Sequence, residues 1–455
     1  MNSIPEDALL RHLGELQRRP QAAATRERLA QALLDWFTAG WSALDMPAAA
    51  SLRALAADCL GGTGTAPVFG GGAMQPLATG FTNAGIAHLR EIDDAHRAAM
   101  LHPGVVAISP VMAMAAQVPM TRRRAADAVI AGYETALRIG EALGTRHAAL
   151  FHATATAGAV GAAAAAGVAL SLSSQQLHHA LGIAATQSAG LWQLVDDEAH
   201  ESKSLHPAFA VRNGMMAAHA ARRGLPGARA FVSGKRGLYA LLAGDGPMQV
   251  LSEGFAAPER INTATIKAWP CCAQLFTPLD ATLALMQEHR PDVREIESVD
   301  VCIFPHALKI AGVDWPAKPT ETCFSLRYVI AVLLLRGRLG IADTESPDLQ
   351  SPDLLALAGR IRVTTDEAFQ REFPLKRPSR VTLVLKDGRR LSALRELRRG
   401  DPEDPFDWNQ LQQRMRSFAP AMDDAAARRV TAWCEGFADA GLDAQACTPD
   451  PALFG

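Results

Sequence analysis

The sequence predicts a mostly α protein in which a large helical domain is followed by a smaller α+β domain. Three observations predict this class. Alanine, which favours helices and lets them approach closely, is abundant, and hydrophobic residues reach 49% although aromatic residues reach only 6%. Apolar residues recur at three- and four-residue spacing through residues 6–255, which is the helical period. After residue 258 the pattern changes to the alternation typical of strands.

The helices of the first domain are predicted one by one from that spacing. Ser174 is a suitable N-cap for one of them, and Gly224 follows another as a stop signal. The loops at 96–103, 147–152 and 200–207 contain histidines. The predicted helices cover residues 23–39, 122–143, 154–170, 174–189 and 208–223.

The second domain is predicted from short alternating runs and one turn. The pair Asp387-Gly388 is typical of a type I′ hairpin turn and separates two of these runs. The predicted elements are strands over 298–303, 360–364, 381–386 and 389–392, and a helix over 322–335. We therefore expect a helical domain over 1–264, an α+β domain over 265–400, and C-terminal helices over 401–455 that return to the helical domain.

Charge and composition exclude several functions. The 45 Lys and Arg residues balance 47 Asp and Glu residues, so the chain has no excess positive charge to attract nucleic acid or an anionic membrane. Residues 1–20 are polar, unlike a signal peptide. The charge-free stretch 153–170 is built from Ala, Gly and Thr, which predicts a buried helix rather than a membrane span. Seven cysteines do not resemble a disulfide framework, so we expect a cytoplasmic protein.

Histidine is the residue type that points to chemistry. Nine of the thirteen histidines lie between His88 and His206. No two are three or four residues apart, and Cys271 and Cys272 are adjacent, so neither a helical metal motif nor a C-x-x-C motif is present. A metal site assembled from distant loops stays open as an alternative. The glycine runs at 61–64 and 70–72 lack the context of a phosphate-binding loop and predict ordinary loops.

Four segments combine histidines with lysines and acids, at 91–104, 151–158, 202–207 and 266–272. Such groups can bind a polyanionic small molecule and move a proton next to its carboxylates. The alternative is that each histidine caps a helix or donates to a backbone carbonyl. We expect the histidines in ordinary helical context to be structural, namely His178, His179, His219 and His289.

In order, these segments resemble the MmgE/PrpD family, which includes 2-methylcitrate dehydratase, cis-aconitate decarboxylase and iminodisuccinate epimerase. The resemblance spans roughly residues 80–420. Its motifs are Asp93-Asp94, His-Pro-Gly at 102–104, His-x-Thr-x-Thr-Ala-Gly at 152–158, Lys-x-Leu-His-Pro at 203–207 and Lys-x-Trp-Pro-Cys-Cys at 267–272.

The resemblance implies an architecture and a chemistry. The family fold is a large helical domain with a smaller α+β lid, and its active site lies in the cleft between them. Members act on small di- or tricarboxylates, without a metal or other cofactor and usually as homodimers. Their dehydration, decarboxylation and epimerisation reactions all move a proton at a carbon next to a carboxylate.

The resemblance also implies roles for individual residues. His102 and His152 would carry protons, oriented by Asp93 or Asp94. Lys203 and Lys267 would bind substrate carboxylates and stabilise the negative charge that develops as the proton leaves. The remaining expected site residues are Glu91, Thr154 with a hydroxyl for a carboxylate, His206, and Cys272 as a neutral thiol lining the pocket.

The chain departs from the family pattern at its expected substrate face. Glu91 stands where the family commonly has Asp, and Ala95 where it commonly has Thr. Ala84 and Ala208 replace glycines, and residues 196–202 differ from the usual Gly-Thr-Met-Thr type. We therefore expect a metal-independent lyase, most simply a dehydratase or else a decarboxylase, acting on a citrate-like acid. The alternatives are a dicarboxylate epimerase and a catalytically silent carboxylate-binding protein.

Overall fold

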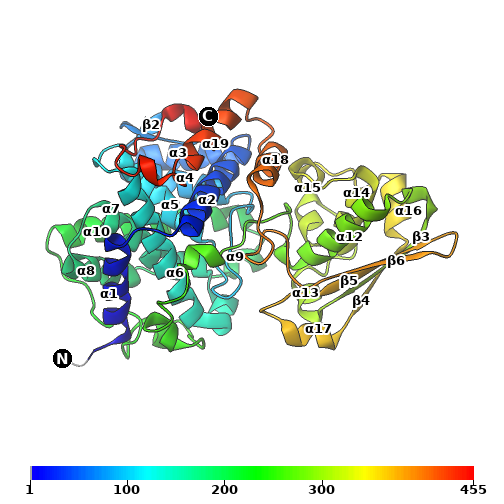
Figure 1. Ribbon diagram of the computed structural model, residues 1–455, viewed down its shortest axis with the longest axis horizontal. Helices are drawn as coiled ribbons and strands as arrows, with labels where there is room; N and C mark the ends of the chain where they lie inside the picture. The colour runs from blue at the N-terminus through cyan, green and yellow to red at the C-terminus, as the bar shows by residue number, and fades with distance from the viewer. Residues whose placement is uncertain (1–2) are drawn as a thin grey trace. The chain divides into compact units, whose positions relative to one another are not determined.

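The computed structural model describes residues 3–455 (Figure 1). The chain divides into two compact units, one formed by Met1–Thr265 with Trp408–Gly455 and the other by Ile266–Asp407. Helices predominate in the described residues, so the expected mostly α class is confirmed. The C-terminal helices belong to the first unit.

The first unit contains the long helices. They are α1 (Pro5–Arg18), α2 (Ala23–Ser42), α3 (Pro47–Ala56), α4 (Pro76–His88), α5 (Pro103–Ala115), α6 (Arg122–Leu150), α7 (Ala153–Ala169), α8 (Ser174–Ala185), α9 (Gln193–Asp196), α10 (Leu205–Arg222), α11 (Leu238–Leu241), α18 (Trp408–Phe418) and α19 (Asp424–Glu435).

Helix α7 lies at the centre of this unit, packed against α5, α6, α8 and α10, and all of its residues are buried. Its small side chains allow this packing. A Cβ atom on Gly161 would lie 2.6 Å from the Cβ of Ala136 in α6, so only glycine fits there. The prediction of a buried helix over 154–170 is confirmed. Within residues 3–455, no helix combines the length and apolar character needed to cross a membrane.

Three local predictions for the first unit differ from the structure. The unit is not entirely helical, because β1 (Ala66–Pro67) pairs with β2 (Ala73–Met74), and Gly70, Gly71 and Gly72 turn the chain between them with positive φ. The N-cap of α8 is Ser173 rather than Ser174, because the Ser173 hydroxyl accepts from the backbone N–H of Gln176. Helix α6 continues past the predicted end at 143 after a kink at Gly144.

The second unit has a four-stranded sheet in the order β4-β3-β5-β6, with β3 and β4 parallel and the other pairs antiparallel. Helices α12 and α14 pack together and against this sheet (Figure 1). Asp387 and Gly388 lie in the turn that joins β5 to β6, but the predicted type I′ turn is wrong, because Gly388 has positive φ and Asp387 does not. The elements are α12 (Phe276–His289), β3 (Ile296–Ile303), α13 (Pro305–Ile310), α14 (Leu326–Arg336), α15 (Ile341–Glu345), α16 (Pro352–Ala358), β4 (Ile361–Thr365), α17 (Glu367–Glu372), β5 (Ser379–Leu385) and β6 (Arg390–Arg395).

Helix α14 starts at Leu326 and not at the predicted 322. The Ser325 hydroxyl accepts from the backbone N–H of Tyr328 and caps the helix there. The preceding residues, Pro319–Phe324, form a 3₁₀ turn.

Candidate active site

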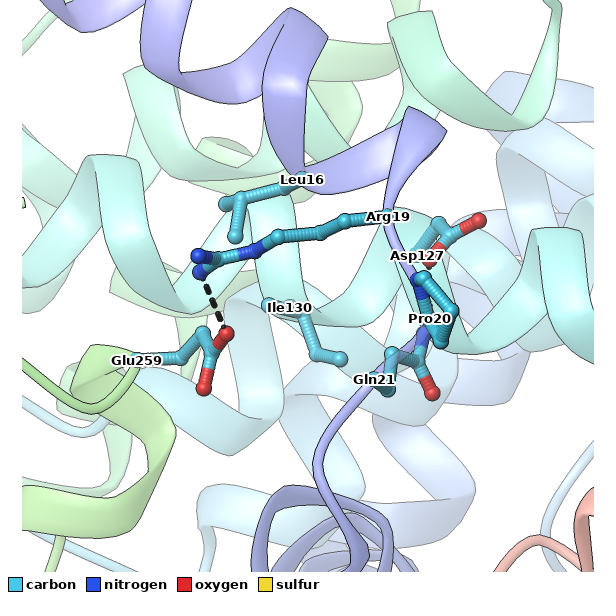
Figure 2. Close-up of a pocket in the computed structure, with 7 residues that line it drawn as sticks. All are labelled: Leu16, Arg19, Pro20, Gln21, Asp127, Ile130 and Glu259. Atoms are coloured by element: carbon cyan, nitrogen blue, oxygen red, sulfur yellow. Dashed lines mark hydrogen bonds and ion pairs between the residues drawn. The ribbon is translucent and has the colours of Figure 1, made fainter. Parts of the chain in front are cut away.

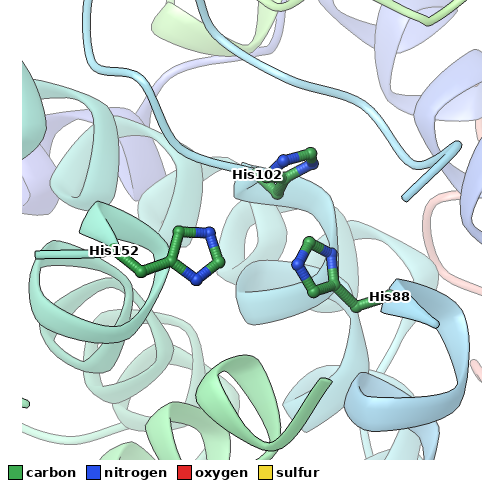
Figure 3. Close-up of side chains that lie close together, drawn as sticks. All are labelled: His88, His102 and His152. Carbon is green, nitrogen blue, oxygen red and sulfur yellow. The ribbon is translucent and has the colours of Figure 1, made fainter. Parts of the chain in front are cut away.

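Four helix ends in the first unit bring histidines together. His88 is the last residue of α4, His102 is the N-cap of α5, His152 is the N-cap of α7, and His206 is the second residue of α10. The ring centroids of His88 and His102 are 4.6 Å apart, and His152 lies 5.5 Å from His88 and 5.2 Å from His206. We call these four residues the imidazole cluster, and Figure 3 shows three of its rings close together.

Asp93 connects two of these rings. Its Oδ2 atom lies 3.0 Å from Nδ1 of His88 and 3.1 Å from Nδ1 of His102. Burial alone would raise the pKa of Asp93, but the charges and hydrogen bonds of His102 and His88 outweigh it and hold the pKa well below its ordinary value. Asp93 is therefore a carboxylate. Because a carboxylate only accepts hydrogen bonds, Nδ1 of His88 is the donor to Asp93, and Nδ1 of His102 lies at ion-pair distance from the same oxygen.

The adjacent Asp94 has a different role. Its Oδ1 accepts from the backbone N–H of Gly104 at 2.8 Å, and its Oδ2 accepts from the Tyr133 hydroxyl at 2.6 Å. Burial and the nearby Asp35 raise the pKa of Asp94 to about 7. Asp94 thus holds the start of α5 in place, whereas Asp93 is the acid that contacts imidazole rings.

The C-terminal helix α18 anchors the loop that contains both acids. Its buried Arg414 forms an ion pair with Asp35 at 2.8 Å and donates to the carbonyl of Ile92 at 2.6 Å. Asp35 in turn accepts from the backbone N–H of Asp94 at 2.8 Å. Residues from α2 and α18 therefore fix the backbone on which Asp93 stands.

His152 and His206 form the other side of the cluster, with their Nδ1 atoms 3.0 Å apart. Burial, assisted by the positive charges of Lys203 and the neighbouring histidines, lowers the pKa of His152 well below its ordinary value. Burial, His88 and Lys203 lower the pKa of His206 to about 4. Both rings are therefore neutral near pH 7.

Lys203 lies beside the cluster on the short 3₁₀ turn His200–Ser204. The lysine is 8% exposed, its Nζ atom lies 5.9 Å from the ring centroid of Trp192, and it forms an ion pair with Glu91. Glu91 has φ of 52°, the left-handed region that non-glycine residues rarely adopt, and its side chain is 45% exposed. Glu91 thus contacts the lysine and faces solvent.

The remaining predicted site residues have other positions. The Thr154 hydroxyl is buried and accepts from the backbone N–H of His102 at 3.0 Å, which ties α7 to the start of α5. Lys267 and Cys272 belong to the second unit. The segment that carries them is held there by hydrogen bonds from Ile266 N–H to the Gly400 carbonyl and from the Trp269 indole to Asp280, at 3.0 and 2.8 Å. Their role in substrate binding stays a prediction.

A pocket elsewhere in the first unit offers less chemistry. Arg19 forms an ion pair with Glu259 across this pocket, at 2.6 Å (Figure 2), and Gln21 donates to Asp127 at 2.6 Å. Its charged groups are thus satisfied by one another. The residues that line it are Leu16, Arg19, Pro20, Gln21, Asp127, Ile130 and Glu259.

Sequence reasoning missed His88, Asp35, Tyr133 and Arg414. His88 lies in an apolar helix and five residues before Asp93, a separation that no helix or metal motif uses. Asp35 and Arg414 are 379 positions apart (414 − 35), and no local pattern relates them. A buried carboxylate that contacts imidazoles, next to neutral imidazoles and a lysine, makes this cluster the candidate acid–base site.

Comparison with known proteins identifies the family. The family model of the MmgE/PrpD N-terminal domain matches residues 8–251, and that of the C-terminal domain matches residues 269–435. The chain therefore belongs to the MmgE/PrpD family, and the resemblance inferred from the motifs is confirmed.

Two relatives show the level of similarity. Cis-aconitate decarboxylase of Aspergillus terreus (strain NIH 2624 / FGSC A1156) is 24% identical over 340 residues, which cover 69% of each chain. Cis-aconitate decarboxylase-like protein oryM of Aspergillus oryzae (strain ATCC 42149 / RIB 40) is 32% identical over 153 residues, which cover 31% of each chain. Together, the family and these relatives support a lyase-type function.

Proposed function

We propose that the protein is a metal-independent lyase that acts on a citrate-like di- or tricarboxylate by moving a proton at a carbon next to a carboxylate. The observation that carries the proposal is the contact between the buried Asp93 carboxylate and His102, close to the neutral His152. This arrangement supplies one imidazole whose positive charge is stabilised and one that is ready to accept a proton.

The two imidazoles divide the proton transfers. His152 is neutral near pH 7 and lies 6.1 Å from His102, centroid to centroid, so it serves as the base that removes the α-proton. Asp93 stabilises a proton on His102, which therefore serves as the acid. His206 orients His152 through the contact between their Nδ1 atoms.

Lys203 and two helix ends supply the positive field that a carboxylate substrate needs. Helices α5 and α7 begin at His102 and His152, so their positive N-terminal ends lie at the imidazole cluster. Lys203 adds one positive charge beside the cluster. We propose that Lys267 of the second unit binds another carboxylate of the substrate.

In dehydration, His152 takes the α-proton, the electron pair forms the double bond, and hydroxide leaves with the proton from His102. In decarboxylation, carbon dioxide leaves its electron pair on the substrate, and an imidazolium protonates that carbon. The relatives named cis-aconitate decarboxylase favour the second reaction as a candidate beside the first. Both reactions use the same proton carriers.

Proton NMR in deuterated water tests the proposal. The purified protein is incubated with citrate, 2-methylcitrate and cis-aconitate in separate samples that contain a chelator. A new vinylic signal from citrate or 2-methylcitrate supports dehydration, and loss of carbon dioxide from cis-aconitate supports decarboxylation. Exchange of an α-proton without elimination indicates an epimerase instead. Line broadening of the acids without any exchange indicates a carboxylate-binding protein and contradicts the proposal.

Variants test the assigned residues. His102→Gln and Lys203→Met should each reduce turnover by at least about tenfold, because each removes a group that acts in the transition state. The control is His219→Gln, which removes an exposed imidazole of α10. Unchanged turnover in both site variants would show that the assignment is wrong.

A further inference from the structure

The imidazole cluster contains one ring that the proposed reaction does not use. His88 is 1% exposed, and its Nδ1 contacts Asp93. Its Nε2 atom is buried and has no hydrogen-bond partner among residues 3–455. A buried polar atom without a partner is unfavourable, so this nitrogen is in a position to gain from binding a ligand.

The rings of His102 and His152 lie next to the ring of His88, with centroids 4.6 and 5.5 Å from its centroid. Each of the three histidines offers one ring nitrogen, and these three atoms lie within 4.8 Å of one another. Figure 3 shows the rings, which come from the end of α4 and the starts of α5 and α7, turned toward a common space. Three helix ends thus fix the positions of three imidazoles.

The surroundings of the rings match those of metal-binding histidines. A histidine that binds a metal usually donates its other ring N–H to a carboxylate, a carbonyl or water, which fixes the tautomer and increases the basicity of the ligand nitrogen. The carboxylate of Asp93 is such a group for two of the rings. Its Oδ2 atom lies 3.0 Å from Nδ1 of His88 and 3.1 Å from Nδ1 of His102. For His152, the group in contact with Nδ1 is His206.

From this geometry, we propose that His88, His102 and His152 bind a divalent transition-metal ion such as Zn²⁺, and that the bound ion inhibits the enzyme. Three imidazoles with an open fourth position are a common ligand set for zinc, whereas magnesium and calcium prefer oxygen ligands. The ion would occupy the nitrogen lone pairs that the proposed reaction needs for proton transfer. The inhibition therefore rests on the proposed function, but binding of the ion does not.

A small closure of the site is required. With zinc–nitrogen bonds of about 2.0–2.1 Å, tetrahedral geometry places ligand nitrogens about 3.4 Å apart, compared with separations of up to 4.8 Å in the structure. His102 is 12% exposed and lies at a helix N-cap, so its ring is the least confined of the three. The longest nitrogen–nitrogen separation must therefore shorten by up to about 1.4 Å to bring the three nitrogens within range of one ion.

Isothermal titration calorimetry of the chelator-stripped full chain with ZnCl₂ tests the binding. We expect one ion per chain with micromolar or tighter affinity. His88→Gln should weaken binding at least 100-fold, and Asp93→Asn should weaken it about 10- to 100-fold because it removes the carboxylate that holds two ligands. His219→Gln should bind zinc like the wild type. Equal affinity in His88→Gln and the wild type would overturn the site.

Zinc K-edge X-ray absorption of the wild type gives a test that needs no variant. Three nitrogen ligands at about 2.0–2.1 Å are expected, and a shell with sulfur, or with only oxygen, would overturn the proposal. Turnover measured with and without added zinc separates the two proposals. Zinc that binds with the expected ligands but leaves turnover unchanged refutes the inhibition. Zinc binding by a chain that converts none of the three acids in chelator refutes the proposed function and leaves the metal site in place.

Discussion

The substitution Asp93→Asn tests whether the carboxylate between His88 and His102 serves catalysis. The carboxylate is 1% exposed, and a single oxygen atom of it lies 3.0 Å from Nδ1 of His88 and 3.1 Å from Nδ1 of His102. An asparagine of the same size keeps the packing but removes the negative charge that stabilises a proton on His102. We therefore expect kcat to fall while KM stays within about twofold, because Asp93 does not reach the substrate in the proposed arrangement.

The magnitude follows from the one contact that lies on the proposed reaction path. A hydrogen bond to a charged group contributes about 1.5–3 kcal/mol, and each 1.36 kcal/mol of barrier corresponds to a factor of ten in rate. Loss of the stabilisation at His102 thus predicts a decrease in kcat of roughly 10- to 150-fold. The contact to His88 is lost as well, but it adds to stability and not to this rate.

Asp94→Asn is the matched control. This neighbouring carboxyl is equally buried, but its partners are the backbone N–H of Gly104 and the hydroxyl of Tyr133, which can rotate to accept from an amide. Its pKa of about 7 means that a neutral form is already populated near neutral pH. We expect kcat of Asp94→Asn within about threefold of the wild type. Equal losses in both variants, in steady-state assays below the unfolding temperature of each, would refute the assignment of Asp93 as the positioning residue.

Three further predictions concern the rest of the molecule. Burial raises the pKa of Asp280 from 3.8 to about 6, so the folded state retains a proton that the unfolded state has lost between these values. Stability should therefore fall by about 3 kcal/mol as the pH rises through this window, and Asp280→Asn should remove this slope in urea titrations. Gly161→Ala should destabilise the chain by about 1–3 kcal/mol, because the added methyl group would collide with α6. Gly14→Ala in the open part of α1 should stabilise the chain by about 0.5–1 kcal/mol. Thermal unfolding measures both changes. Lys203→Met should raise the pKa of His206, which burial and neighbouring positive charges lower to about 4, as measured by NMR titration of the ring.

The parts of the fold that follow from local patterns could be predicted. The Ala- and Gly-rich residues 153–170 indicate a helix that neighbours cover closely, and α7 is buried throughout. Asp387-Gly388 predicts the place of the β5–β6 turn but not its type, because only Gly388 adopts positive φ. The kink at Gly144 was not predicted, because a glycine within a helical pattern is compatible with either continuation or a stop.

The residue types of the site could be predicted from the sequence, but their arrangement in space could not. Asp93 and Asp94 are adjacent and chemically identical, and the backbone alone decides which of them faces the rings. That backbone is set by Arg414 and Asp35, which are remote in sequence, and by Glu91 with its positive φ. Spacing rules describe contacts three and four residues apart within a helix. They give no information on His88. This ring contacts His102 and His152 because the end of α4 and the starts of α5 and α7 lie close together.

The ion pair between Glu91 and Lys203 gives the lysine a counter-charge in the site without substrate. A buried ammonium without a counter-charge is strongly unfavourable, and Lys203 is 10% exposed at its side chain. Glu91 supplies the counter-charge from a side chain that is 45% exposed. In the proposed function, a substrate carboxylate takes its place and Glu91 turns into solvent. The lysine then has an anionic partner both before and after binding. We therefore attribute to Glu91 a share in determining which carboxylates bind strongly enough to displace it.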